Sequence, residues 1–395
     1  MKQTRNQQLK MLLEKGVKIP NPESVEIGHD VSVDRISGNG TMIHSASKIL
    51  GESTLILDHV IIGHENPATV SNCYIAPGVE LKGGYFSNAV FLKNAQAGSG
   101  AHVREGTILE EEASIAHTVG LKQTILFPFV TLGSLINFCD CFMSGGTGKK
   151  DHSEVGSSFI HFNFTPNQDK ATASLIGDVP RGVMLDRKPI FLGGQGGVVG
   201  PCRLTYGTVT AAGTICRKDE LREGRLIFGG PGKTGNIPYS TRGKAVKRTV
   251  MNNLVYIANL VALMRWYEHV RSLFIDDTFP EALLSGMKDT LALGTNERVN
   301  RLKGFLEPII DPGKRWAEIG RRFQSCLSEK GNERLMGDFI NAFKARIIGS
   351  KKDYLGTIKD LSGDEKKTGT AWLQTVVDQV VGKMEQPVIE LIKRN

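Results

Sequence analysis

The sequence predicts a mainly β protein: a left-handed parallel β-helix followed by an all-α domain. Between about residues 25 and 220, short aliphatic segments ending in glycine or another small residue recur at rough multiples of six positions. This repeat is typical of a β-helix with three short strands per coil. One aliphatic side chain per repeat fills a narrow prism, and small residues form the tight corners. After about residue 244 the apolar residues instead recur at helical spacing.

The six-residue repeat is degenerate, but it continues over a long segment, and this length supports the prediction of a β-helix. An antiparallel β-sandwich is the structural alternative, although it does not require a six-residue period. The clearest members of the repeat are Ile27-Gly28, Ile49-Leu50-Gly51, Leu55-Ile56-Leu57, Ile61-Ile62-Gly63, Ile75-Ala76-Pro77-Gly78 and Ala97-Gly98.

The predicted domain boundaries follow from these changes of pattern. Residues 1–24 contain a short helix with Leu9, Leu12 and Leu13 on one stripe, and residues 25–228 form the β-helix. Two polar insertions, 140–158 and 180–188, interrupt the repeat at places where a solenoid tolerates loops. Glycine and proline mark 229–243 as a linker, and 244–395 form the helical domain.

Composition narrows the functional classes. The net charge is +8, and residues 244–395 carry most of the basic excess, which favours either a solvated helical surface or attraction to anions. No nucleic-acid-binding motif accompanies this charge, so we expect no nucleic-acid partner. Six cysteines without a C-x-x-C pair argue against a disulfide scaffold or a zinc ribbon. We expect a cytoplasmic protein, with no signal peptide and no membrane span.

Two segments resemble known binding motifs but match them incompletely. Residues 229–234 resemble a phosphate-binding P-loop, but Ile227 occupies the position where the first glycine is required. His59 and His64 have a spacing that hexapeptide carbonic anhydrases use for zinc, but no convincing third histidine accompanies them. We therefore predict no metal site and keep a zinc hydratase only as a minor alternative.

A stronger signal lies in residues 159–214. Asn163-Phe164 is followed by Lys170 and then by Leu175-Ile176-Gly177-Asp178, and further on come Phe191-Leu-Gly-Gly194 and Thr210-Ala-Ala212-Gly-Thr. Over roughly residues 50–220 the chain resembles the acetyltransferase half of the bifunctional N-acetylglucosamine-1-phosphate uridyltransferase/glucosamine-1-phosphate acetyltransferase family. The uridyltransferase half has no counterpart here.

The resemblance implies roles for individual residues. Arg104 and Lys122, which are one 18-residue coil apart, match an arginine and a lysine that hold a sugar phosphate. A guanidinium fork and an ammonium group suit a dianionic phosphate. Asn163, Phe164 and Lys170 match further substrate-binding positions. Gly194 and Ala212 match the coils on the side of coenzyme A, so acetyl-CoA is the expected acyl donor.

One departure concerns the general base. The resemblance places a histidine twelve residues after Lys122, where this chain has Ser134, and a tyrosine where it has Asn137. An amine that attacks a thioester must lose a proton, which a base with a pKa near neutrality accelerates. We expect His161 to supply this base, because in an extended segment it shares a face with Asn163. His117 and His152 are the alternatives.

The leading hypothesis is therefore a homotrimeric acyltransferase that acts on an amino sugar phosphate or a nucleotide sugar. The alternative is a non-catalytic sugar-nucleotide-binding or assembly protein built on the same scaffold. A histidine near the pocket of Arg104 and Lys122 favours the enzyme.

Overall fold

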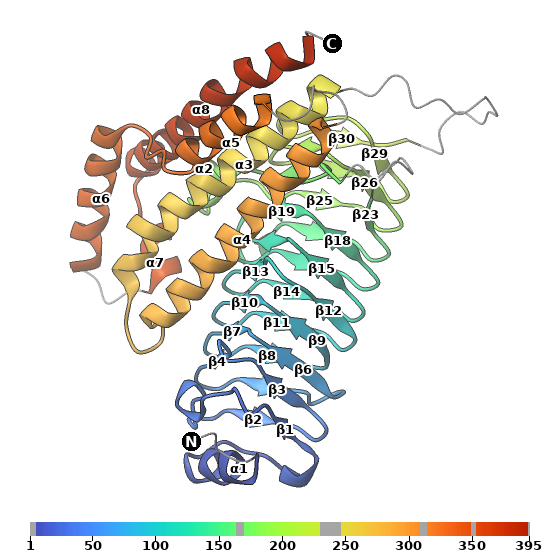
Figure 1. Cartoon of the computed structure of the whole chain (residues 1–395), viewed down its shortest axis with the longest axis vertical. Helices are drawn as coiled ribbons and strands as arrows, with labels where there is room; N and C mark the ends of the chain where they lie inside the picture. The colour runs from blue at the N-terminus through green and yellow to red at the C-terminus, as the bar shows by residue number, and fades with distance from the viewer. Residues whose placement is uncertain (1–4, 163–169, 230–245, 308–313, 349–352, 394–395) are drawn as a thin grey trace, which may run out of the picture.

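The computed structural model describes residues 5–162, 170–229, 246–307, 314–348 and 353–393. It confirms the predicted fold class: a left-handed parallel β-helix followed by a helical region (Figure 1). The β-helix has three parallel sheets, called here A, B and C. Most coils contribute one strand to each sheet, whereas the first and last described coils meet sheet C only through isolated bridges at Ile36 and Glu220. Along the chain the order is B, C, A, so every coil has a B–C, a C–A and an A–B corner.

The strands are two to four residues long, as expected for a repeat of six. Sheet A contains β2 (Met42–Ile43), β5 (Ile61–Ile62), β8 (Glu80–Leu81), β11 (Gln96–Ala97), β14 (Ser114–Ile115), β17 (Thr131–Leu132), β22 (Glu154–Val155), β25 (Phe191–Leu192), β28 (Val209–Thr210) and β30 (Leu226–Ile227). Sheet B contains β1 (Glu26–Ile27), β3 (Lys48–Leu50), β6 (Ala68–Ser71), β9 (Gly84–Ser87), β12 (Ala101–Val103), β15 (Gly120–Lys122), β18 (Asn137–Cys139), β23 (Ile160–Phe162), β26 (Gly197–Val199) and β29 (Ile215–Cys216). Sheet C contains β4 (Leu55–Ile56), β7 (Tyr74–Ile75), β10 (Ala89–Phe91), β13 (Thr107–Leu109), β16 (Ile125–Leu126), β19 (Cys141–Met143), β24 (Ser174–Ile176) and β27 (Arg203–Leu204).

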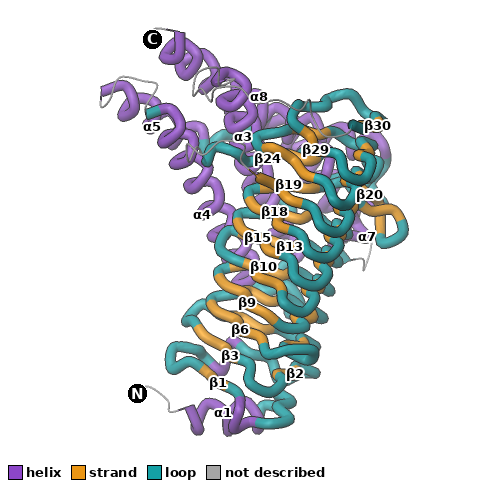
Figure 2. Tube along the Cα trace, turned by 90° about the vertical axis from the view of Figure 1, so that its right-hand side faces the viewer, coloured by secondary structure: helices purple, strands orange, loops and turns teal. Residues whose placement is uncertain are grey.

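Two local structures interrupt the coils. An antiparallel hairpin of β20 (Gly146–Gly148) and β21 (Asp151–His152) lies within the predicted insertion 140–158 and projects from the stack (Figure 2). The short helix α2 (Val179–Gly182) begins the second insertion, and the side chain of Asp178 caps it by accepting a hydrogen bond from the Arg181 N–H. At the other end of the solenoid, α1 (Arg5–Glu14) lies against the first coil (Figure 1). Its Leu9 and Leu12 are buried, whereas Leu13, predicted to lie on the same stripe, is 42% exposed because the helix turns it away from the coil.

The helical region consists of long helices packed on one another and on the solenoid. Its elements are α3 (Val246–His269), α4 (Glu281–Leu306), α5 (Lys314–Cys326), α6 (Glu333–Ile348), α7 (Tyr354–Lys359) and α8 (Gly363–Lys393). Figure 1 shows α3 and α4 lying along one side of the later coils, with α8 beyond them. No helix among the described residues is long and apolar enough to cross a membrane.

Sheet C is buried on both faces, because the helices cover the side that points away from the prism. The outward residues form one apolar ladder from coil to coil. Its members, in register order, are Leu55, Tyr74, Val90, Ile108, Ile125, Phe142 and Leu175. Helix α4 contacts β7, β10 and β13, and it approaches so closely that a Cβ on Gly286 would lie 2.4 Å from the Tyr74 ring. Sheets A and B keep their outer faces largely exposed, so a site for a soluble ligand has to be sought there.

Candidate functional site

The exposed face of sheet B carries the two predicted phosphate-binding residues side by side. Arg104 and Lys122 directly follow Val103 and Leu121, which are paired in neighbouring strands β12 and β15. Both side chains are partly exposed at the B–C corner. The next coil places Cys139 beside Lys122. The regular repeat thus brings two cations, one coil apart in sequence, to the same edge of one sheet.

A carboxylate shares this edge. Lys122 Nζ lies 2.7 Å from Glu105 Oε1, and the hydrogen bond from Lys122 contributes to lowering the pKa of Glu105, against the effect of its partial burial. Arg104 has a different environment, since its Nε is buried with no hydrogen-bond partner in the described part of the chain. An anion that binds here would meet the Arg104 guanidinium, which lies beside the Cys139 thiol, and the Lys122 ammonium group, which already has an acidic neighbour.

Helix α4 borders the same corner. The Arg298 side chain, which is 3% exposed, forms an ion pair of 2.9 Å with Asp140, the residue after Cys139. One turn of helix earlier, Gly294 faces Gln123, which follows Lys122. The helical region thus forms one wall beside the edge that carries Arg104 and Lys122.

His161 does not share the exposed face. In β23 its neighbours Ile160 and Phe162 are exposed or partly exposed, while His161 itself is 7% exposed and points into the prism between Phe138 and Val198. Its Nε2 is 2.8 Å from Ser174 Oγ. Burial lowers the pKa of His161 to about 4. In this placement a bound amine has no direct path to the imidazole, and the prediction that His161 is the base remains untested.

The other predicted substrate residues are Asn163, Phe164 and Lys170. Asn163 and Phe164 fall outside the described residues, and Lys170, just beyond that gap, is exposed. Of the two alternative bases, His152 lies on the projecting hairpin, with Nδ1 2.7 Å from the carbonyl oxygen of Lys149. His117 lies at an A–B corner and is exposed.

The A–B corners form a column of stacked residues. Backbone hydrogen bonds join successive corner residues. In each bond, the N–H of the residue that follows one corner residue donates to the carbonyl oxygen of the corner residue one coil earlier. This column contains, in order, Ser99, His117, Ser134, Ser157, Gly194 and Ala212. The two positions predicted to lie beside coenzyme A are therefore stacked on the same edge as Ser134.

Packing between coils accounts for some of the glycine in this column. A Cβ on Gly194 would lie 2.7 Å from the carbonyl oxygen of Ser157, and one on Gly193 would lie 2.5 Å from that of Thr210. Ala212 is exposed, and the space around Gly213 is open. The residues around Ala212 therefore have small side chains and leave an accessible surface, which a narrow and flexible ligand requires.

Sequence reasoning missed His102, which also lies on the exposed face of sheet B. Its ring stacks on Tyr85 with 5.0 Å between the ring centroids, and it is paired with Gly120 across β12 and β15. Strand alternation was the available signal, because His102 and Arg104 are two residues apart and point to the same face.

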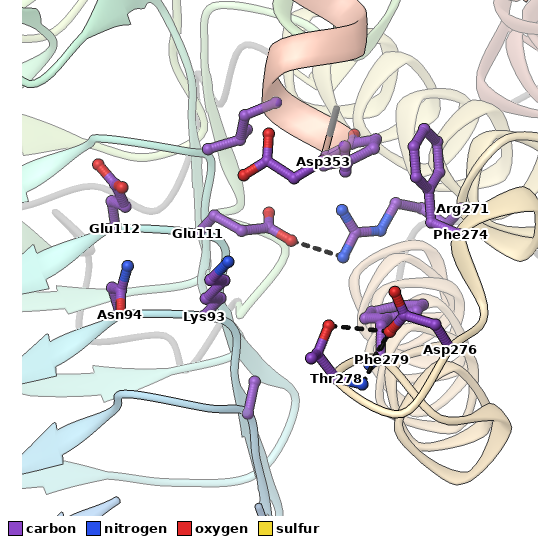
Figure 3. A pocket seen from close by; sticks show the side chains of 13 residues that line it. Lys93, Asn94, Glu111, Glu112, Arg271, Phe274, Asp276, Thr278, Phe279 and Asp353 are labelled. Carbon is purple, nitrogen blue, oxygen red and sulfur yellow. Dashed lines mark hydrogen bonds and ion pairs between the residues drawn. The ribbon is translucent and has the colours of Figure 1, made fainter. Parts of the chain in front are cut away.

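A separate pocket lies between the solenoid and the helices (Figure 3). It has a volume of about 160 Å³, and Arg271, which is 2% exposed, extends across it to pair with Glu111 at 2.5 Å. The Arg271 guanidinium lies 3.8 Å from the centroid of the Tyr354 ring. Next to this pair, burial raises the pKa of Glu110 to about 8. Arg271 and Tyr267 of the helical region pair with Glu111 and Glu110 of the solenoid, so we interpret these contacts as a junction that fixes the helices on the solenoid.

Among the residues that the structure describes, no group of three or more histidine, cysteine, aspartate or glutamate side chains is arranged to hold a metal ion. His64 instead lies near Glu80, at 3.5 Å, and near His44, with 6.1 Å between ring centroids.

Comparison with known proteins points to one class. No family model matches the chain. Curated relatives named "Bifunctional protein GlmU" do match. The relative from Thermotoga sp. (strain RQ2) is 26% identical over 218 residues, which cover 55% of this chain and 43% of the relative. Those from Trichlorobacter lovleyi and Mycobacterium leprae are 26% and 24% identical over 207 and 204 residues, covering 52% of this chain in both cases and 39% and 36% of the relatives.

These findings define the class of the protein as an acyltransferase-like hexapeptide-repeat protein with a left-handed β-helix. More particularly, the solenoid and the matches fit the acetyltransferase half of GlmU-like proteins, as the sequence motifs predict. The chain spans about two fifths of the length of the curated relatives it matches.

Proposed function

We propose that this protein is a cytoplasmic acyltransferase that moves an acyl group, in the first instance acetyl, from coenzyme A to the amino group of an amino sugar phosphate or nucleotide sugar. The observation that carries the proposal is the position of Arg104 and Lys122 on one exposed edge, in a β-helix whose relatives are named GlmU. The two cations bind the phosphate of the acceptor, with Arg104 as the group that forms no ion pair within 4 Å among the described residues.

The reaction proceeds by attack of the acceptor amine on the thioester carbonyl. A C–N bond forms, the amine loses a proton to a base, the C–S bond breaks, and the sulfur leaves as the thiol of coenzyme A after taking up a proton. The small surface at Gly194 and Ala212 accommodates the pantetheine arm, and Asn163, Phe164 and Lys170 contact the acceptor. We further propose a homotrimer with sites between neighbouring prisms, where cyclic symmetry repeats the same contact three times.

A non-catalytic sugar-nucleotide-binding or assembly protein is the second candidate. Two observations favour it: serine occupies the position expected for the base, and His161 is enclosed in the prism. The two candidates predict the same binding of phosphates but differ in turnover.

One experiment separates them. The purified chain is incubated with acetyl-CoA and a panel of hexosamine phosphates and UDP-hexosamines, and thiol release is followed together with the mass of the acceptor. Acceptor-dependent thiol release with acetylated product supports the enzyme. Calorimetric binding of a sugar phosphate without turnover across the panel supports the binding protein, and absence of both contradicts both candidates.

A further inference from the structure

The side chain of His117 meets the residue that occupies the expected position of the base. His117 Nδ1 lies 2.8 Å from Ser134 Oγ, and the two residues are neighbours in the A–B corner column. Ser134 is itself held in place, since its N–H donates to Ser157 Oγ and its carbonyl oxygen accepts from the Ser158 N–H. The His117 imidazole thus starts from the corner one coil before position 134, where the sequence motif places the catalytic histidine.

This hydrogen bond leaves the other ring nitrogen available. A hydroxyl can accept a hydrogen bond from Nδ1–H, and in that tautomer Nε2 carries a lone pair. When Nε2 takes up a proton, Nδ1 stays protonated and Ser134 Oγ continues to accept from it, so the imidazolium keeps its partner. His117 is exposed, in contrast to His161.

A groove gives His117 an accessible setting. It has a volume of about 350 Å³ and lies over the outer face of sheet A, where Ser114, Thr131 and the His117 corner line it. The charged groups that line it are Glu65 and Lys82, which pair with each other at 3.3 Å. The groove therefore places no unpaired carboxylate against the imidazole, and its polar walls suit a hydroxylated or amide-bearing ligand.

The position of His117 in the column gives its approximate distance from the two predicted substrate-binding regions. Gly194, on the coenzyme A side, lies three coils beyond His117, or about 14 Å at the usual spacing between strands. Ser134 precedes Cys139, the neighbour of Lys122, by five residues, or about 16 Å of extended strand. The long side chains of Arg104 and Lys122 start from one edge of sheet B, and that of His117 starts from the other.

We propose that His117, oriented by Ser134, is the base that takes the proton from the acceptor amine; this inference rests on the proposed acyl transfer. As the nitrogen–carbon bond forms, Nε2 of His117 accepts the N–H proton. When the carbon–sulfur bond breaks, the imidazolium returns this proton to the departing sulfur. The hydroxyl of Ser134 acts as a positioning group that stabilises the charged ring.

The test compares His117→Gln and Ser134→Ala with the wild type, with His29→Gln, an exposed histidine on the first coil, as the matched control. Turnover with acetyl-CoA and the best acceptor is measured from pH 5 to 9, and binding of both substrates by calorimetry. We expect His117→Gln to lower kcat by about 10²–10⁴, the usual contribution of a general base. Substrate dissociation constants should stay within about twofold, and the rise of kcat with pH should disappear.

Ser134→Ala should keep the pH dependence but lower kcat, because the ring loses the hydrogen bond that orients it. Wild-type kcat and an unchanged pH profile in His117→Gln would overturn the assignment while leaving acyl transfer intact. A similar loss in His29→Gln would overturn it as well, since the effect would then not be specific to the corner column. Absence of turnover in the wild type would overturn the proposed function, and this inference with it.

Discussion

The anion site at the B–C corner gives a prediction that the local charges make quantitative. Arg104→Ala removes the guanidinium, and only Lys122, which is already paired with Glu105, is left for the phosphate. A hydrogen bond between charged groups contributes about 1.5–3 kcal/mol, so sugar-phosphate binding should weaken by roughly 10- to 150-fold. Isothermal titration with glucosamine 1-phosphate measures this directly.

Glu105→Gln provides the opposite change at the same edge. It frees the Lys122 ammonium and removes a carboxylate that repels the ligand. An exposed pair is worth about 0–1 kcal/mol, so affinity should rise by up to about fivefold. Arg334→Ala serves as the control, because Arg334 is an exposed arginine on α6. Unchanged affinity in Arg104→Ala, or weaker binding in Glu105→Gln, would refute the phosphate role of this edge.

Two further predictions concern stability. Gly286→Ala should destabilise the protein by about 1–3 kcal/mol, because its Cβ would overlap the Tyr74 ring under α4. Gly304→Ala in the same helix has open space around it and should stabilise the protein by up to about 1 kcal/mol. Denaturant titration measures both changes, and equal effects would contradict the close packing of α4. Since burial raises the pKa of Glu110 from 4.5 to about 8, the folded state binds a proton that the unfolded state has lost, so stability should fall by about 1.4 kcal/mol per pH unit between pH 5 and 8. In Glu110→Gln this part of the decline should vanish, and an unchanged slope would show that Glu110 is ionised in the fold.

The sequence was sufficient for the architecture because the repeat encodes it. A regular coil length fixes register, so the separation of Arg104 and Lys122 predicted that they lie on adjacent coils, and β12 and β15 place them there. The hydrophobic character of Val90 and Ile108 on the outer face of sheet C was also visible in the sequence. Recognising it as a helix-binding surface required the register, since strands of two or three residues are too short to show whether apolar residues alternate along them.

The base was harder to predict, because a one-residue change of phase moves a side chain from one face of a strand to the other. His161 was placed on the face of Asn163, which follows from alternation, but alternation does not say whether that face points inward. Beside Phe138 it points into the prism. The contact of His117 with Ser134 joins residues one coil apart, and only the positions of both side chains reveal it.

The transfer of an acyl group is the central claim, and mass spectrometry of the acceptor tests it most directly. The wild-type chain is incubated with acetyl-CoA carrying a ¹³C-labelled acetyl group and with the hexosamine phosphate that binds best. We predict an acceptor that gains one labelled acetyl group on its amino nitrogen, with one equivalent of free coenzyme A. Tight binding of the sugar phosphate with no labelled product at any pH between 6 and 9 would contradict it, and would leave a binding protein on an acyltransferase fold.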